Sequence, residues 1–273
     1  MEANEKRLSM TSNPPLSIAQ LSAASMFIFI NALLSFLLKL EIGKTLLISA
    51  IRSVVQLGLV GVFLSWVFTL NSPYPTLMTM VSMSLIAAYT AASRSKYHYA
   101  GLFWHSVVAV GISSWLLVLF PAQLILNPTP WYQAQYLIPF LGMLLGNSLN
   151  GISLALNTAT QDFLREKEKI EQALSFGANK WEAARGAVKE AIKMGTIPVT
   201  NAMMIAGLVS LPGMMTGQIL AGMDPYEAAK YQVFILFLIT GASFFGTMMV
   251  VYFCYRRCFN QMHQFSTMHL KKN

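Results

Sequence analysis

The sequence predicts an all-α membrane protein, a polytopic bundle of about seven transmembrane helices with a helical cytoplasmic insert. Of its 273 residues, 55% are hydrophobic and only 11% are charged, against roughly 25% charged in an ordinary soluble domain. Uncharged runs such as 195–223 and 233–255 reach the ~20 apolar residues that cross a bilayer as a helix. This composition excludes a soluble enzyme, a disordered chain and a disulfide-rich secreted module.

Seven hydrophobic segments follow a polar N-terminal tail of residues 1–15. They cover approximately 16–38, 45–70, 75–92, 101–126, 136–157, 196–222 and 229–253. The first is too long for the apolar region of a signal peptide, so we expect it to be retained. The chain is therefore divided into the tail, helices one to five (16–157), a cytoplasmic helical insert (158–195), helices six and seven (196–253) and a basic cytoplasmic tail (254–273).

The loops predict the orientation in the membrane. Basic residues lie in 39–44, 94–96 and 162–193 and in the C-terminal tail, whereas the alternating loops 71–74 and 127–135 carry no charge. The positive-inside rule places the basic loops in the cytoplasm. Seven spans then put the N-terminus outside and the C-terminus inside. Because the net charge of +8 gathers at the ends of apolar runs, we expect a lipid bilayer and no nucleic acid as its partner.

Two of the expected spans carry polar side chains at helical spacing. Arg52 and Gln56 share one face of the second span. Either Arg52 extends to the cytoplasmic surface, or both residues face a translocation path. Asn147 and Asn150 share a face of the fifth span, where they either join helices by hydrogen bonds or line that path.

The sixth segment has the most specific pattern of the chain. Pro212 and Gly213 predict a break or kink in the helix at membrane depth. Irregular backbone is tolerated there only when protein or a wet cavity shields it. The break serves helix packing in one interpretation. In the interpretation we prefer, it is a gate or binding element that displays Met214, Met215, Thr216 and Gln218.

The insert holds 13 of the 30 charged residues, between Asp162 and Lys193. Within it, Glu171, Ala173 and Gly177 have the spacing of the EAA-x-x-x-G motif, and they resemble the coupling motif of ABC importer permeases. Gly177 is suited to end one helix, and Asn179 with Glu182 to begin the next. Phe176 and Trp181 supply aromatic anchors for a partner. Importers place a proline where this chain has Glu190.

Taken together, several stretches resemble the FetB-type permeases, a family with bacterial iron-export permeases and plant aluminium-tolerance membrane proteins. The stretches are Ile138-Pro139, Gly142-Met143, Gly146-Asn147, Ala173-Leu174, Gly177-Ala178, Leu211–Gly222, Asp224-Pro225 and Tyr231-Gln232. The resemblance implies an ABC transporter permease of the bacterial inner membrane that exports metal, chiefly iron, and protects against oxidative stress. It also implies a separate ATPase subunit that holds ATP and magnesium, and a dimer of permeases.

The residues disfavour two other classes of protein. An ion-driven secondary transporter or channel needs an ionisable relay within the spans or an inverted repeat, and only Arg52 is plainly intramembrane. An enzyme is disfavoured because His98 and His105 have no acidic or thiol partner near them in sequence. Gly43-Lys44-Thr45 matches only the end of a P-loop. The chain is therefore expected to bind no cofactor of its own, and its metal ligands stay unassigned.

Overall fold

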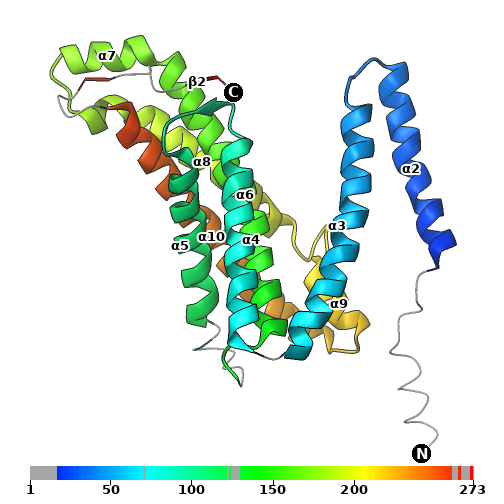
Figure 1. The fold of residues 1–273 in the computed structure, drawn as a ribbon. Helices are drawn as coiled ribbons and strands as arrows, with labels where there is room; N and C mark the ends of the chain where they lie inside the picture. Colours follow the sequence, from blue (N-terminus) through cyan, green and yellow to red (C-terminus); the bar gives the residue numbers. More distant parts are fainter. Residues whose placement is uncertain are drawn as a thin grey trace, which may run out of the picture. The chain divides into compact units, whose positions relative to one another are not determined.

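The computed structural model describes residues 17–70, 72–121, 123, 130–259, 264–265 and 271–272. These residues form nine helices and one two-stranded sheet (Figure 1). The N-terminal tail 1–15 lies outside the described residues, and the C-terminal tail lies within them only in part. The chain divides into two compact units. One contains α2, α3 and Gly217–Met223, and the other contains the remaining elements from Ser72 onward.

The first unit is a helical hairpin of α2 (Ile18–Leu37) and α3 (Gly43–Leu70). Ser17 begins α2 with a capping box, because its hydroxyl accepts from the Gln20 N–H and the Gln20 side chain accepts from the Ser17 N–H. Most of the large apolar side chains of both helices are exposed, and among the hairpin residues whose burial the structure describes, Ser35 and Val67 are the buried ones. A helix that is apolar all round suits a hydrocarbon environment.

The second unit is a bundle in which α6 packs against α10, α8, α4 and α5. The bounds of its elements are α4 (Pro73–Ser93), β1 (Tyr97–His98), α5 (Leu102–Pro121), α6 (Ala134–Arg165), α7 (Lys167–Ser175), α8 (Lys180–Ile205), α9 (Gly213–Leu220), α10 (Pro225–Cys258) and β2 (Lys271–Lys272). The second half of α9 is grouped with the first unit. The strand β2 pairs antiparallel with β1, which brings residues 271–272 beside the turn after α4.

Small residues allow α6, α8 and α10 to pack closely. Gly151 of α6, Gly195 of α8 and Gly246 of α10 lie at positions where an added Cβ would be under 3.0 Å from a neighbouring helix. Gly142 and Gly146 of α6 have the GxxxG spacing that lets helices approach closely, but a Cβ on Gly146 would meet nothing within 4 Å and one on Gly142 only the end of Met83. Van der Waals packing between small residues is the main means by which helices associate in a bilayer.

Six helices of the described chain are long and apolar enough to cross a membrane: α2, α3, α4, α5, α6 and α10. The polytopic all-α fold expected from the sequence is confirmed. The expected sixth span, 196–222, is not a single helix, because it consists of the end of α8, a non-helical segment and the short α9. Furthermore, α6 continues beyond residue 157 and α8 continues through residue 195, so no helix ends at either expected domain boundary.

Candidate functional site

The turn between α7 and α8 forms from strictly local interactions. Gly177 adopts φ +87°, the left-handed conformation that glycine accepts without strain. The Gly177 N–H donates to the Leu174 carbonyl and the Ala178 N–H to the Ala173 carbonyl, at 3.0 and 3.1 Å. These two bonds define a Schellman motif, which satisfies the last carbonyls of α7. The predicted role of Gly177 in ending this helix is confirmed.

The next helix begins at a complete capping box. The Asn179 side-chain oxygen accepts from the Glu182 N–H, and the Glu182 carboxylate accepts from the Asn179 N–H, both at 2.9 Å. This confirms the cap expected for Asn179 and Glu182. A sharp turn with both helix ends satisfied gives the α7–α8 corner a defined shape without support from distant residues.

Two aromatic side chains of the corner are available to a partner. Phe176 is 82% exposed and Trp181 is 49% exposed, as their proposed role as anchors requires. Trp181 also makes an edge contact with Tyr255 of α10, with ring centroids 5.9 Å apart. On the other side of α7, Ile170 is 1% exposed, so it anchors the helix while Phe176 projects from it.

Beside the corner, α7 and α8 enclose a shallow hollow of about 410 Å³. Its lining includes Ala173 of the motif and Gly186, the carboxylates of Glu166 and Glu182, and the cations Lys169, Arg185 and Lys189. Arg185 and Lys189 also border a second hollow of about 260 Å³ that contacts Trp181. Neither makes an ion pair with another residue that the structure describes. Glu171, by contrast, pairs with Lys167 at 3.7 Å.

The helix break begins before Pro212 and Gly213, the residues at which the sequence predicts it. Helix α8 ends at Ile205, Ala206 is extended, and Gly207 adopts φ +79°. The Ile205 carbonyl accepts from the N–H groups of residues 208, 209 and 210, and the Gly207 N–H donates to the Ser210 carbonyl. Pro212 instead precedes α9, where its carbonyl accepts from the Thr216 N–H at 3.0 Å. Proline suits this position because no helical donor is lost there.

The start of α9 is held by a side chain from α10. Gln232, which is 6% exposed, accepts from the Met215 N–H through Oε1 at 3.3 Å. That N–H belongs to the first turn of α9, which has no partner within its own helix. The sequence reasoning assigned Gln232 no role, although an amide inside the apolar stretch after Tyr231 was a usable signal.

The remaining candidates around the break are only half-buried. Met214, Met215 and Thr216 are partly exposed, Gly213 is exposed, and the Thr216 hydroxyl donates to the Pro212 carbonyl at 3.2 Å. Gln218 is also partly exposed, but its buried Oε1 has no hydrogen-bond donor in the part of the chain described. These groups offer a mixture of amide, hydroxyl and thioether atoms and no acidic ligand.

The amides of α6 fall into two sets. The Asn147 side chain donates to the Met143 carbonyl of its own helix at 2.8 Å. Asn150 accepts from the Arg94 guanidinium at 3.1 Å, and Asn157 binds the Lys96 N–H and the Arg94 carbonyl at 2.7 and 3.2 Å. Asn150 and Asn157 thus attach α6 to the turn after α4, which is the helix-joining interpretation of these residues.

Arg52 and Gln56 are both exposed on α3 within their own unit. They lie four residues apart, so they share a helix face as expected. Their role in a translocation path stays a prediction.

His105, which the sequence disfavours as a catalytic residue, contacts aromatic side chains. His105 Nδ1 lies 3.2 Å from the Tyr99 hydroxyl, and its ring stacks on Phe253. Burial raises the pKa of the Tyr99 phenol, so this group stays neutral. Cys254 and Cys258 are buried free thiols. In the described residues, no three His, Cys, Asp or Glu side chains are grouped to hold a metal ion.

Comparison with known proteins decides the family. The model of the family described as "Uncharacterised protein family (UPF0014)" matches residues 18–259. The chain belongs to the UPF0014 family. This span contains the α7–α8 corner, the break after α8 and every candidate site residue, so these features lie within the family's shared region.

Members of the UPF0014 family from bacteria and plants are similar to the chain. It is 33% identical to the "Probable iron export permease protein FetB" of Escherichia coli (strain K12), over 92% of this chain and 96% of that one. It is 39% identical to a UPF0014 membrane protein of Synechocystis, over 78% and 82%. It is 29% identical to "Protein ALUMINUM SENSITIVE 3" of Arabidopsis thaliana, over 90% and 89%. No solved structure gives a significant match.

Proposed function

We propose that the chain is the membrane permease subunit of an ABC transporter and that the α7–α8 corner receives the ATPase subunit. The observation that carries this proposal is the corner itself. Gly177 closes a Schellman turn, Asn179 caps α8, and Phe176 is left 82% exposed beside them. A large aromatic side chain held outward on a stiff turn has the form of a protein–protein anchor.

In this proposal, ATP and magnesium bind the partner, because the chain has no complete nucleotide-binding motif. Two permease chains form the assembly, and each presents its corner to one ATPase. The lining of the two hollows refines the description of the partner surface. The charged residues of the hollow beside Trp181 are Arg185 and Lys189, which have no ion pair among the described residues, so this hollow favours an acidic surface on the ATPase.

Helix α8 connects the corner with the break. It runs for 26 residues from Lys180 to Ile205 with Pro198 inside it, about 39 Å at 1.5 Å per residue. A displacement of the corner by ATP binding is therefore transmitted along this one helix to the segment around Gly207. We infer that this movement opens and closes the translocation route beside α9.

The proposed cargo is metal, chiefly iron, and the proposed direction is export from the cytoplasm. The support is the similarity to the Escherichia coli relative, which is named as a probable iron export permease. Hydroxyl and amide oxygens of Thr216 and Gln218 suit iron better than the thioethers of Met214 and Met215, since soft sulfur prefers soft ions. The protein would lie in the bacterial inner membrane with its N-terminus outside and its basic C-terminal tail in the cytoplasm.

The experiment is co-purification of the tagged permease with the ATPase encoded in the same cell, followed by transport in proteoliposomes. Wild-type protein is expected to retain the ATPase and to move iron when ATP is supplied on the ATPase side. Ferrous, ferric and aluminium ions are compared as cargo. Gly177→Glu and Trp181→Ala are expected to stay in the membrane but to lose ATPase retention and ATP-dependent transport.

Gly222→Glu is the matched control for Gly177→Glu. Gly222 also adopts a left-handed φ, +91°, so the substitution introduces the same charge and a similar backbone strain away from the corner. It is expected to keep the ATPase bound. Full ATP-dependent transport by Gly177→Glu would disprove the assignment of the corner, and iron movement without any ATPase would disprove the ABC class.

A further inference from the structure

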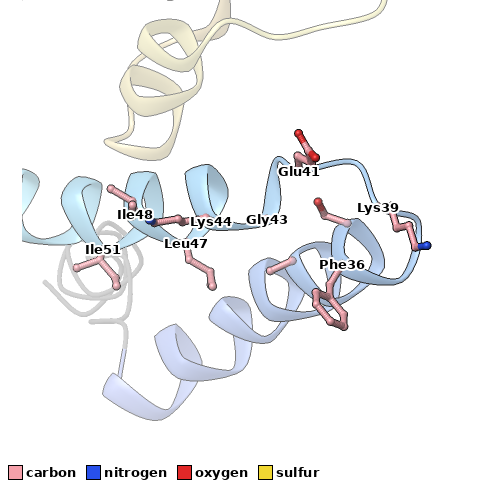
Figure 2. A pocket seen from close by; sticks show the side chains of 10 residues that line it. Phe36, Lys39, Glu41, Gly43, Lys44, Leu47, Ile48 and Ile51 are labelled. Carbon is pink, nitrogen blue, oxygen red and sulfur yellow. The ribbon is translucent and has the colours of Figure 1, made fainter.

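A cavity of about 750 Å³ lies between α2 and α3, next to the turn that joins them. Figure 2 shows the side chains that line it. The cavity belongs entirely to the first unit and takes no part in the proposed coupling. It has one polar end, at the turn, and one apolar wall, along α3.

The polar end contains the N-terminus of α3. The first three N–H groups of a helix have no partner within it, and the preceding residue, Ile42, has no side-chain acceptor to cap them. The helix dipole adds a partial positive charge at the same place. An N-terminus in this condition favours an anion.

A buried hydroxyl provides a second, independent observation at this end. Ser35 of α2 is 3% exposed, and no described residue hydrogen-bonds its Oγ. This atom lies beside the start of α3, 3.4 Å from the position that a Cβ on Gly43 would occupy. A buried polar atom without a partner is costly, so a ligand that reaches Ser35 would relieve that cost.

Charged side chains surround the mouth of the cavity. Lys39, Glu41 and Lys44 line it, which leaves one net positive charge. Lys39 points outward from the tip of the turn, whereas Lys44 lies along α3 toward Ile48 (Figure 2). A ligand with one negative charge matches this balance, and hydroxyl groups on it would give Glu41 donors to accept from.

The wall of the cavity is apolar and leads away from the polar end. Leu47, Ile48 and Ile51 of α3 line it, and Ile48 and Ile51 are 54% and 67% exposed. A helix with such an apolar surface faces hydrocarbon in a bilayer. Acyl chains therefore lie against this wall, whereas a small soluble anion does not extend along it.

We propose that this cavity binds one anionic phospholipid with a hydroxylated headgroup, of the phosphatidylglycerol type. The phosphate lies against the N-terminus of α3, Lys44 and the Ser35 hydroxyl, and an acyl chain follows Ile48 and Ile51. The basic turn is the part of the hairpin that we expect at the cytoplasmic surface, where anionic lipids attract lysines. The site would therefore tie the hairpin to that leaflet.

The test is native mass spectrometry of the full-length protein in detergent, with phosphatidylglycerol or phosphatidylcholine added. The wild type is expected to retain phosphatidylglycerol on the order of tenfold better. Lys44→Met is expected to remove most of this preference. Ser35→Leu, which fills the polar end, is expected to lower the retention of both lipids.

The controls separate this site from general surface charge. Lys96→Met removes an exposed lysine of another basic loop, and Ser53→Leu places a leucine at an exposed serine of the same hairpin. Both are expected to bind lipid as the wild type does. Equal retention of the two lipids by the wild type, or an equal loss in Lys44→Met and Lys96→Met, would overturn the proposal.

A competition with glycerophosphoglycerol, the deacylated form of phosphatidylglycerol, identifies the source of the anion. It carries the same charged and hydroxyl groups without acyl chains, so it is expected to displace phosphatidylglycerol only at concentrations far above those of the lipid. Displacement at equal concentration would show a site for free phosphates and would also overturn the proposal. None of these measurements needs ATP, cargo or ATPase, so their result is independent of the transport function.

Discussion

Gly151 of α6 and Gly195 of α8 lie backbone against backbone. A Cβ on Gly195 would stand 2.8 Å from the Gly151 carbonyl oxygen, and a Cβ on Gly151 would stand 2.5 Å from the Gly195 carbonyl oxygen. The Thr247 Cγ2 of α10 lies 2.7 Å from the same Gly195 position. Three helices thus meet where no side chain fits, midway along the element that links the corner to the break.

The first prediction concerns this crossing. Gly195→Ala is expected to destabilise the protein by about 1–3 kcal/mol, because the methyl group forces helices apart in a packed core. The measurement is the apparent thermal unfolding temperature in detergent. If the permease function is right, iron transport falls as well, because α8 changes its position against α6.

Gly186→Ala is the matched control on the same helix. A Cβ there would meet nothing within 4 Å, so the substitution is expected to raise stability by up to about 1 kcal/mol through better helix propensity. Unfolding temperatures that shift equally in the two variants would show that Gly195 has no special packing role.

A second prediction concerns the attachment of α6 to the turn after α4. Asn157→Ala removes the acceptor of the Lys96 N–H and the donor to the Arg94 carbonyl. Loss of these bonds is expected to cost about 1–2 kcal/mol and to speed hydrogen exchange at the Lys96 amide.

Asn157→Asp separates the two bonds. It keeps an acceptor for the Lys96 N–H and loses only the donor, so the Lys96 amide is expected to stay protected. Unchanged exchange in Asn157→Ala would mean that the turn is held by other contacts, such as the pairing of β1 with β2.

A third prediction concerns the hold of α10 on α9. Gln232→Leu removes the acceptor of the Met215 N–H, and the buried leucine cannot replace it. Hydrogen exchange at the Met215 amide is expected to rise about tenfold, the equivalent of one modest hydrogen bond. Gln232→Glu keeps an oxygen at this position and is expected to preserve protection. The interpretation fails if both variants exchange alike.

A fourth prediction concerns the corner between α7 and α8. Asn179→Ala is expected to cost about 1 kcal/mol by removing the cap of α8, whereas Asn179→Ser is expected to cost little because serine caps nearly as well. Limited proteolysis after Gly177 measures the effect, and it should be faster only in Asn179→Ala. Equal cleavage of both variants would show that the cap does not stiffen the corner.

The corner could be predicted from the sequence because its interactions are local. Gly177 ends α7, and Asn179 binds a residue three positions away, so the residue types and their spacing already specify the geometry. The membrane class follows from composition for a related reason. A bilayer imposes the same length and polarity on every helix that crosses it.

Other features depend on contacts between distant residues. The spacing of Asn147 and Asn150 predicts one shared face but not which of them reaches the turn at Arg94. The sequence predicts the break at Pro212, yet α8 ends at Ile205. Gly207 permits a turn in which the N–H groups of residues 208, 209 and 210 all donate to the Ile205 carbonyl.

The sequence by itself determined the membrane class, six of the seven expected spans as single helices, and the corner at Gly177. Only the tertiary structure decided which glycines carry the helix crossing and which amide holds α9. The physical reason is that Gly146 and Gly151 have equal local properties. They differ only in what another helix places opposite them, open space for Gly146 and the backbone of Gly195 for Gly151.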